Sequence, residues 1–512
     1  MRSLKPRHKV IMQPIVHQFK TTPDVNDALL AIQHLPGVLL LDSARQIETA
    51  KGQPLGRYSF LMADPFDWLV SDQALEDPFE KIRDLLKQCQ AETVSDLPPM
   101  QGGVAGLLSY DLNRSFEAVP QAGFNTFPIP DIVMGAYDTV ISWDHQTNQA
   151  WIVSQGFPEV DADKRVRRAQ ERIDFFLSAL SAKVTSELPA ISSEPESLEL
   201  SSFQYAVAGP AGLTSNFSAS RFKESVQKCV DYIYAGDVFQ INLAQQLRIA
   251  ANCHSLELYL RLKDANPAPF SAFFDFEVNG FERTQIISSS PERLAAVNQG
   301  HVETRPIKGT RPRTGRPMVD IWAREKLSSS EKDIAENTMI VDLMRNDLSR
   351  VCTDDSVTVP QLCEMEEYAS VMHLVSSVEG QLRPECDLTD LLSAIFPGGS
   401  ITGAPKVRAM EIIAELEPDS RGAYCGSLGY LGFDGNADLN ILIRTITAQR
   451  GWWQIPVGGG IVSQSNPKLE YDETWAKAAG LLRAVAVGET DEVFSEQRQQ
   501  RQQRDQQQQA QQ

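Results

Sequence analysis

The sequence is poor in the features that mark membrane proteins, secreted proteins and nucleic-acid binders. No apolar run approaches the roughly 20 residues that a membrane-spanning helix requires. Acidic residues outnumber basic ones, 67 against 48, and a net charge of −19 argues against a partner with a phosphate backbone. The opening segment is basic, but Gln13 and Pro14 interrupt its apolar stretch, so it lacks the core of a signal peptide. We therefore expect a cytoplasmic protein that binds neither nucleic acid nor membrane.

Cysteine and histidine are also sparse and scattered. The seven cysteines form no C-x-x-C pair, and their odd number suits a reducing compartment and disfavours a structural zinc site. The seven histidines contain no H-x-x-x-H pair. A metal in this protein is therefore expected to be a hard cation held by carboxylates.

Composition divides the chain into zones. Residues 1–185 mix strand-like runs with one long helical stretch, and residues 186–217 contain a segment rich in Ser, Pro and acids that is typical of a linker. Residues 218–490 are dense in motifs. The stretch 495–512 is mostly Gln with almost no apolar side chain, so we predict that it is disordered.

Several elements can be placed from local signals. Helices are predicted to begin after Ser330, at Pro405 and after Asn466, where capping residues or proline precede apolar positions at helical spacing. Val407 is expected on the inward face of the second of these helices. The β-branched run 439–448 predicts a single strand. Together the signals indicate a fold that mixes helices and sheets.

Two pairs of acids stand out on the predicted helices. Asp333 and Glu336 are three residues apart and share a helix face, and Glu470 and Glu473 repeat the arrangement. If the two pairs face each other, they form an oxygen-rich pocket suited to Mg²⁺. Acids in a first helical turn are also favoured by the helix dipole and then simply face solvent. Spacing alone leaves both interpretations open.

A glycine-rich turn runs into a helix at 396–410, with the sequence FPGGSITGAPKVRAM. Its glycines have P-loop spacing, but Ala404 and Pro405 stand where that motif has Lys and Ser or Thr, so a triphosphate is excluded. The free N–H groups of the helix start, with the Thr402 hydroxyl, favour a carboxylate ligand. A helix start that needs small residues is the alternative.

Three other features point to an anionic ligand or an activated amine. Gly458, Gly459 and Gly460 either let a ligand approach the backbone or form a tight turn. Arg444, in an apolar run, is expected to pair with a carboxylate of a ligand or of the protein. Lys308 stands among three arginines, which would lower the pKa of its amine if they are also close in space. A solvent-exposed basic loop is the alternative.

The ordered motifs TRPIKGTRPR (304–313), AENTMIVDLMRNDLSRV (335–351), FPGGSITGAPKVRAMEII (396–413) and IRTITA (443–448) together resemble the chorismate-utilising enzymes. That family includes anthranilate synthase component I, aminodeoxychorismate synthase component I, isochorismate synthase and salicylate synthase. The match is dense over 218–487 and weaker in the first third. It implies the α+β fold of anthranilate synthase component I, with large mixed and antiparallel sheets packed together and flanked by helices.

Lys308 distinguishes the branches of the family. Anthranilate synthases typically carry Ala there, so the chain looks most like the aminodeoxychorismate synthase branch. That branch makes 4-amino-4-deoxychorismate from chorismate and ammonia for para-aminobenzoate and folate. No amidotransferase domain is evident, so a separate glutamine amidotransferase subunit is implied. Isochorismate and salicylate synthases also carry Lys, and Glu379 stands where the isochorismate-type relatives place an acid. Water as nucleophile, an anthranilate synthase and a tryptophan-binding regulatory homologue remain alternatives.

The resemblance implies roles for single residues. Lys308 would attack carbon 2 of chorismate to form a covalent adduct, and Glu292 would protonate the departing hydroxyl. His373 matches an active-site histidine of the family. Contacts to chorismate are implied for Gly309, Thr310, Thr402, Tyr424, Arg444, Gly458, Gly459, Gly460 and Lys477.

The resemblance also implies a metal and a second ligand. Mg²⁺ would be held by Glu336 and Glu473, with Asp333 and Glu470 as outer-sphere partners. A bound tryptophan is implied at Ser43, Arg57, Tyr58, Pro269, Phe270 and Ser271.

Overall fold

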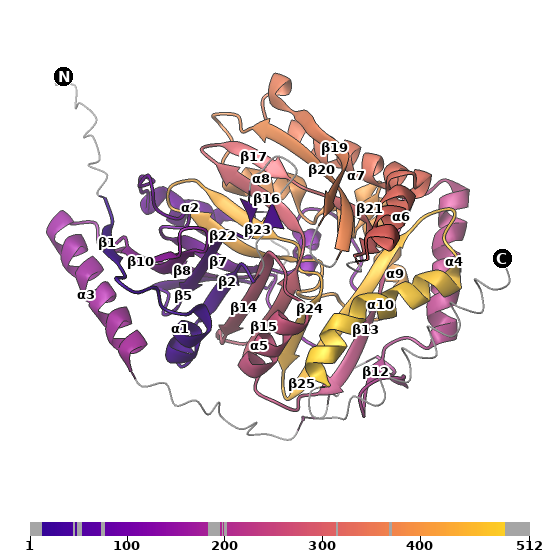
Figure 1. Ribbon diagram of the computed structural model, residues 1–512, viewed down its shortest axis with the longest axis horizontal. Coiled ribbons are helices and arrows are strands. Elements are labelled where there is room, and N and C mark those ends of the chain that lie inside the picture. Colours follow the sequence, from indigo (N-terminus) through magenta and orange to yellow (C-terminus); the bar gives the residue numbers. More distant parts are fainter. Residues whose placement is uncertain are drawn as a thin grey trace.

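The computed structural model describes residues 13–44, 47–48, 54–72, 77–182, 195–196, 198, 202–313, 316–367 and 371–486. Within them, two large antiparallel sheets pack face to face and helices cover their outer faces (Figure 1). The predicted α+β architecture is therefore confirmed. The stretch 495–512 lies outside the described residues, and so do residues 186–194, 197 and 199–201 of the predicted linker 186–217. No described helix combines the length and the apolar character that crossing a membrane requires.

The first sheet contains thirteen of the described strands. Its spatial order is β1 (Ile15–Gln18), β10 (Gln149–Ser154), β9 (Thr139–Asp144), β5 (Tyr58–Met62), β2 (Leu39–Asp42), β14 (Phe270–Phe276), β15 (Thr284–Ser290), β24 (Thr445–Gln449), β25 (Trp452–Ile461), β13 (Gln240–Ala250), β12 (Thr214–Ser215) and β11 (Tyr205–Ala206). The short β21 (Gly403–Ala404) also pairs with β13.

The second sheet contains ten of the described strands. Its order is β18 (Ile307–Pro312), β20 (Val371–Gln381), β17 (His301–Thr304), β16 (Arg293–Asn298), β23 (Ala437–Asn440), β22 (Ser427–Gly432), β7 (Gly103–Leu108), β8 (Ile132–Tyr137) and β6 (Asp67–Ser71), with β19 (Thr358–Glu367) also on β20. A separate small hairpin joins β3 (Ile47–Glu48) and β4 (Pro54–Leu55).

The helices divide between the two outer faces. The first sheet is covered by α1 (Val25–Ile32), α3 (Ala162–Ser181), α5 (Ser255–Ala265) and α10 (Pro467–Val485), and at its β13 end by α4 (Ala219–Ala235) and α9 (Lys406–Leu416). The second sheet is covered by α2 (Glu80–Gln88), α6 (Pro317–Ser328), α7 (Glu331–Ser349) and α8 (Leu388–Ile395). Three short 3₁₀ turns, η1 (Tyr110–Ser115), η2 (Asp354–Ser356) and η3 (Gly399–Ile401), complete the described elements.

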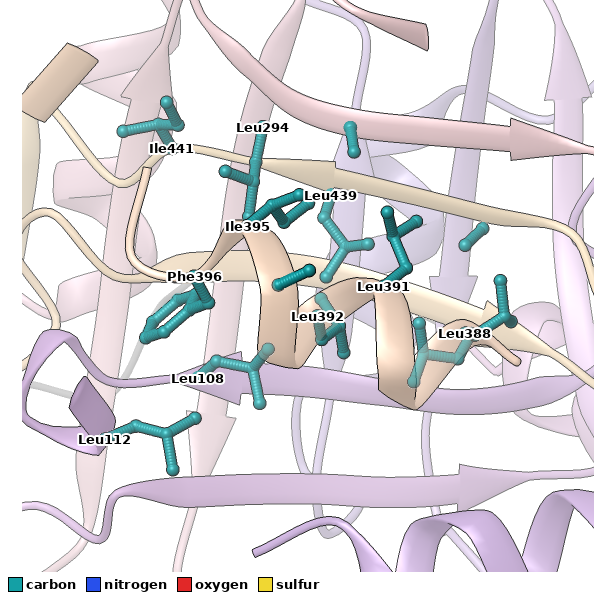
Figure 2. Packing of buried hydrophobic residues seen from close by; sticks show 14 of the residues in the cluster. Leu108, Leu112, Leu294, Leu388, Leu391, Leu392, Ile395, Phe396, Leu439 and Ile441 are labelled. Carbon is teal, nitrogen blue, oxygen red and sulfur yellow. The ribbon is translucent and has the colours of Figure 1, made fainter. Parts of the chain in front are cut away.

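Helix α8 shows how local sequence and packing combine. Asp387 and Asp390 form a reciprocal capping box at its start, which satisfies backbone N–H groups that the first turn leaves without partners. Leucine and isoleucine then recur at helical spacing and are buried against the second sheet (Figure 2). The chain leaves this packed helix at Phe396 and enters the glycine-rich turn.

The chain crosses between the sheets at two neighbouring places. It leaves β15 in the first sheet and enters β16 in the second through Pro291 and Glu292. It returns from β23 to β24 through residues 441–444, and Arg444 adopts a left-handed backbone with φ of 52°. The prediction of a single strand over 439–448 is therefore wrong. A continuous strand cannot serve both sheets, because it must bend where it changes layer.

The predicted helix starts are confirmed. Ser330 caps α7, Pro405 precedes α9 and Asn466 caps α10. The inward direction predicted for Val407 is wrong, since that side chain is 36 % exposed, whereas Met410 and Ile413 on the same helix are buried. Val407 lies in the first turn of α9, where the helix borders a cavity instead of the sheet.

Strands from both predicted zones share the sheets. In the first sheet β2 pairs with β14, with Leu39 opposite Phe274, and in the second β7 pairs with β22, with Val104 opposite Leu431. The zone boundaries at 185 and 218 stay a prediction about the sequence. In space, the two zones are joined by backbone hydrogen bonds in both sheets.

Candidate active site

Lys308 lies on the edge strand β18, opposite Leu374 of β20. The pairing shifts register after Lys308, and Gly309 takes a left-handed backbone with φ of 72°. A Cβ at Gly309 would lie 3.0 Å from Cγ of Asp333, so the close approach of β18 to α7 also requires glycine. The Lys308 amine donates to the carbonyl of Ser400 at 3.2 Å.

The environment of Lys308 lowers the pKa of its amine. Burial has the largest effect, Glu336 and Glu292 oppose it, and Lys477 lowers the pKa further. The lowered pKa agrees with the sequence prediction, but the predicted cause is wrong. The neighbouring arginines are engaged elsewhere: Arg305 bonds Glu366 and Arg311 bonds Asp333 at 3.0 Å. Side chains alternate along a strand, so neighbours in sequence point to different surroundings.

Glu292 occupies the first crossing between the sheets and is buried. Burial raises the pKa of its carboxyl, and the Ser400 side chain and Lys308 offset the rise in part. Among the described residues, Glu292 Oε1 finds no hydrogen-bond partner. A carboxyl with a raised pKa and an unpaired oxygen is suited to donate a proton to a ligand.

Arg444 occupies the second crossing, next to the first. The amide of Ile441 donates to the Glu292 carbonyl at 3.0 Å, and the amide of Ser289 donates to the Arg444 carbonyl at 3.2 Å. Burial lowers the pKa of Arg444, and Glu292 counteracts it. The two sheet crossings therefore place an acid and a cation side by side.

The first two turns of α7 and α10 bring the four predicted acids together. The Lys332 amine lies 3.7 Å from Glu336 Oε1 and 3.6 Å from Glu470 Oε1, so it links the two helices. A Cβ at Gly459 would lie 3.6 Å from Glu473 Oε1 and 3.9 Å from Glu470 Oε2. The acids therefore converge where β25 carries no side chain.

These residues fit the expected Mg²⁺. Glu336 Oε1 is buried without a hydrogen-bond partner among the described residues, and burial raises the pKa of this carboxyl. Within the described part of the chain, no three His, Cys, Asp or Glu side chains gather closely enough to enclose a metal by themselves. Mg²⁺ needs only one or two carboxylates, because waters and substrate oxygens complete its shell. A buried carboxylate oxygen that accepts no hydrogen bond is therefore a suitable ligand.

Each of the other acids of the cluster has a cation or a hydroxyl as a close partner. Burial raises the pKa of Glu473, but Lys477, 2.9 Å from its Oε1, more than compensates and leaves this pKa below its ordinary value. Asp333 pairs with Arg311, and Glu470 accepts from the Ser465 hydroxyl at 2.6 Å. Glu336 Oε1, by contrast, accepts no hydrogen bond from a described residue and has only the more distant Lys332 amine, at 3.7 Å.

Of the remaining predicted contacts, Lys477 and the glycines of β25 adjoin this group. Gly458, Gly459 and Gly460 lie within β25, paired with β13, and so do not form a turn. Lys477 donates to the Gly458 carbonyl at 2.9 Å. Thr402, directly after η3, and Tyr424 are buried. His373 is buried on β20, opposite Thr310, and the side chain of Thr310 is not among those described.

Some residues of the site escaped sequence reasoning. Ser400 accepts from Lys308 through its carbonyl and stands beside Glu292, whereas the sequence analysis singled out only Thr402 of this motif as a ligand contact. The buried Arg421 and Asn242 both donate to the carbonyl of Ile401, at 3.0 and 2.9 Å. They hold the glycine-rich turn from segments far away in sequence, and no local pattern marks them.

The six residues implied for tryptophan line one cavity of about 500 Å³ between the two sheets. They are Ser43, Arg57, Tyr58, Pro269, Phe270 and Ser271. Arg57 is held by Asp144, with nitrogen and oxygen 2.6 Å apart.

Glu379, the acid that the isochorismate-type relatives also carry, lies on β20. It is five residues from Leu374, the residue opposite Lys308, and its carboxylate lies 3.5 Å from the His301 ring.

Comparison with known proteins places this site in a family. The family model described as chorismate binding enzyme matches residues 38–483. Aminodeoxychorismate synthase component 1 of Salmonella typhimurium is 38 % identical over 92 % of this chain and 98 % of its own. Anthranilate synthase component 1 of Thermus thermophilus is 34 % identical over 96 % of this chain and 99 % of its own.

Solved structures agree on the fold. Anthranilate synthase component I from Streptococcus pneumoniae superposes with a TM-score of 0.68 at 29 % identity, covering 83 % of this chain and 92 % of its own. The menaquinone-specific isochorismate synthase MenF from Escherichia coli gives 0.66 at 18 % identity, covering 94 % and 97 %, and supports the fold alone.

Proposed function

The chain belongs to the chorismate binding enzyme family, and we propose that it is the chorismate-aminating component of an aminodeoxychorismate synthase. It would convert chorismate and ammonia to 4-amino-4-deoxychorismate, the precursor of para-aminobenzoate in folate synthesis. The observation that carries the proposal is the buried Lys308 amine, with its lowered pKa, near the carboxyls of Glu292 and Glu336. Four relatives named aminodeoxychorismate synthase component 1 are 36–40 % identical over most of the chain.

The first step would form a covalent adduct. The lone pair of the Lys308 amine attacks carbon 2 of the ring, the ring double bonds shift, and the bond from carbon 4 to its hydroxyl breaks. Glu292 donates a proton, so that the hydroxyl leaves as water. The opposite pKa shifts support these roles, because burial favours both a neutral amine and a protonated carboxyl.

The second step would deliver the nitrogen. Ammonia bonds to carbon 4, the double bonds shift back, and the bond from carbon 2 to Nζ breaks. Lys308 leaves as a neutral amine, and the Glu292 carboxylate takes the extra proton from the new ammonium group. The net change is chorismate plus ammonia to aminodeoxychorismate plus water, with both side chains restored.

Chorismate carries carboxylates, and the acid cluster would repel them. Mg²⁺, held by Glu336 and Glu473 with Asp333 and Glu470 around them, would supply the positive charge that a substrate carboxylate requires. Arg444 and Lys477 add cations beside Glu292 and Gly458. These side chains support binding of a dianionic ring with its carbon 4 near Glu292.

The ammonia is proposed to come from a partner. The relatives' designation as component 1 implies a second subunit, and we infer a glutamine amidotransferase. This subunit would hydrolyse glutamine and pass the ammonia to the present chain.

The test is to incubate the purified chain with chorismate and Mg²⁺, with and without an ammonium salt. Amination only with ammonium, and a mass increase on Lys308 equal to chorismate minus water when ammonium is omitted, are expected. Lys308→Ala should lose the adduct and the product. If isochorismate or salicylate forms without ammonium, the chain belongs to the branch that uses water as the nucleophile. If anthranilate forms, the chain belongs to the anthranilate synthases. An inert but chorismate-binding chain would indicate a regulatory homologue.

The cavity between the sheets is proposed to hold tryptophan. Its Phe270 and Tyr58 rings and Pro269 offer apolar contact to an indole, while buried polar groups at its edge suit an amino acid head group. Isothermal titration with tryptophan should show saturable binding, with phenylalanine as the control ligand. Heats that are equal and negligible for both would refute this assignment.

A further inference from the structure

The backbone of the glycine-rich turn helps to orient the Lys308 amine. The carbonyl of Ser400 accepts from this amine at 3.2 Å, and Ser400 also stands beside Glu292. When a neutral amine donates one N–H to a fixed carbonyl, the direction of its lone pair is restricted. The position of the Ser400 carbonyl therefore affects where the proposed nucleophile points.

The turn is held only loosely by its own hydrogen bonds. The amide of Ile401 reaches the Gly398 carbonyl, and the amide of Thr402 reaches the Gly399 carbonyl, both at the long distance of 3.4 Å. The Thr402 hydroxyl adds a shorter bond to the Gly398 carbonyl at 3.0 Å. The position of this turn therefore depends also on partners from other segments.

The main outside partner is the buried guanidinium of Arg421, in the loop between α9 and β22. It donates to the carbonyl of Ile401 at 3.0 Å and to the carbonyl of Asn242, on β13, at 2.6 Å. The Asn242 side chain donates to the same Ile401 carbonyl at 2.9 Å. Two donors thus fix the carbonyl that follows Ser400 directly in the chain.

The guanidinium is itself held from three sides. Glu417, at the end of α9, accepts from it twice, at 2.9 and 2.7 Å, and also accepts from the Ala244 amide of β13 at 2.8 Å. The ring of Tyr110, in η1, lies with its centroid 4.7 Å from the guanidinium carbon. The Tyr110 amide donates to the Gly422 carbonyl at 2.8 Å. Arg421 therefore has a fixed position relative to both sheets.

Net stability is a poor explanation for this arrangement. The cost of burying the charges of Arg421 and Glu417 offsets most of their attraction, and apolar residues of similar volume often stabilise a core as well. The planar guanidinium, however, directs five donors at fixed angles, so it can bond two carbonyls and a carboxylate at once. Its contribution here is geometric.

We propose that Arg421 is a positioning residue for adduct formation, with Asn242 as its second support. Together they hold Ile401, which places the Ser400 carbonyl and so directs the lone pair of the Lys308 amine toward carbon 2 of chorismate. Arg421 acts through the turn and not on the substrate. The inference rests on the proposed function, because only a nucleophilic lysine needs a directed lone pair.

The test compares two variants at the turn with a matched control. Arg421→Lys keeps the charge but loses the fork of donors, and Asn242→Leu removes the second donor at similar volume. Arg165→Lys is the control: Arg165 is also buried, donates to the Gln155 carbonyl at 2.7 Å and lies over the Phe157 ring, but it belongs to α3. The readouts are the melting temperature and the rate of Lys308 adduct formation without ammonium, measured over a range of chorismate concentrations.

Arg421→Lys should slow adduct formation at saturating chorismate about thirtyfold and Asn242→Leu about tenfold, because a misplacement of about 1 Å can cost about a hundredfold. The chorismate concentration for half-maximal rate should change less than about twofold in both. Arg165→Lys should lower the melting temperature without slowing the reaction.

Two results would overturn the positioning role and leave the proposed function intact. One is adduct formation at the wild-type rate in both turn variants, and the other is an equal loss of rate in Arg165→Lys. If Arg421→Lys does not fold, the rate of Asn242→Leu decides the question by itself. A wild type that forms no Lys308 adduct would overturn both proposals.

Discussion

At the scale of single residues, the site works through opposite shifts of two buried groups. Burial lowers the pKa of the Lys308 amine and raises that of the Glu292 carboxyl. Burial alone thus favours the neutral form of each, even though their charged forms attract each other. The proposed chemistry uses this state, since the amine must be unprotonated and the acid protonated.

Adduct formation should therefore have a bell-shaped pH profile. The rate falls at low pH as Lys308 is protonated, and because its pKa lies below the ordinary value, activity is expected at pH values where a free lysine would be charged. The rate falls at high pH as Glu292 loses its proton, later than an exposed glutamate would. Quenched-flow mass spectrometry of the wild type measures this profile. A rate that rises steadily to pH 10 would show that the proton of Glu292 is not needed.

Glu336→Gln should separate metal binding from stability. The variant loses a charged ligand at constant volume, so turnover and Mg²⁺ binding should be lost, as measured by activity and titration calorimetry. Because the folded pKa of Glu336 is raised, its ionised form destabilises the fold fully above that pKa. The destabilisation declines as pH falls through the folded pKa and is absent below the unfolded pKa. At pH 7 the variant should melt no lower than the wild type.

Lys332→Met serves as the partner experiment for that prediction. The Lys332 amine stands between Glu336 and Glu470, so removing it should strengthen Mg²⁺ binding. Unaltered Mg²⁺ affinity in both variants would place the metal elsewhere.

At the scale of elements, two caps and two crossings assemble the site. Ser330 and Asn466 begin the helices that carry the acids, and the crossings near Glu292 and Arg444 join the two sheets. Each acid lies within two turns of a capped helix start. The order of those first turns therefore controls the geometry of the metal ligands.

Asn466→Ala should test this dependence. The Asn466 side chain accepts from the amides of Lys468 and Leu469 at 3.0 and 3.2 Å, and losing such a cap costs about 1 kcal/mol. In a chain this long that amounts to about 1 °C in melting temperature. A larger effect is expected on the Mg²⁺ concentration for half-maximal activity, because Glu470 and Glu473 follow in the same helix. Asn466→Asp keeps the acceptor and should behave like the wild type; an equal Mg²⁺ requirement in the Ala variant would contradict the coupling.

At the scale of the whole molecule, the two sheets join the predicted zones into one folding unit. β2 pairs with β14 and β7 pairs with β22, so each large sheet contains strands from before residue 185 and strands from after residue 218. The core between the sheets contains residues from both zones, such as Phe60, Phe274 and Tyr430.

Residues 13–190 and 191–486 expressed separately should therefore fail to fold. Each would expose a sheet edge and half of the core between the sheets. Expressed together they should reassemble and recover chorismate-dependent activity, which gel filtration and the amination assay would detect. A soluble, cooperatively melting fragment on its own would show that the zones are independent domains.

Local signals in the sequence determined much of this protein. The capped starts of α7 and α10, the α+β class and the family follow from short motifs, because caps and glycine turns depend on backbone groups only a few residues apart. The paired acids and Lys308 were also identified from these motifs.

The tertiary structure alone decided what surrounds those residues. It split 439–448 between two sheets, placed Gly458–Gly460 in a strand, and turned Arg305 and Arg311 toward acids so that burial is the main cause of the lowered pKa of Lys308. It also brought Ser400 to Lys308 and formed the cavities. The physical reason is that burial and proximity depend on which distant strands pair, and sequence spacing within a motif carries no information about that pairing.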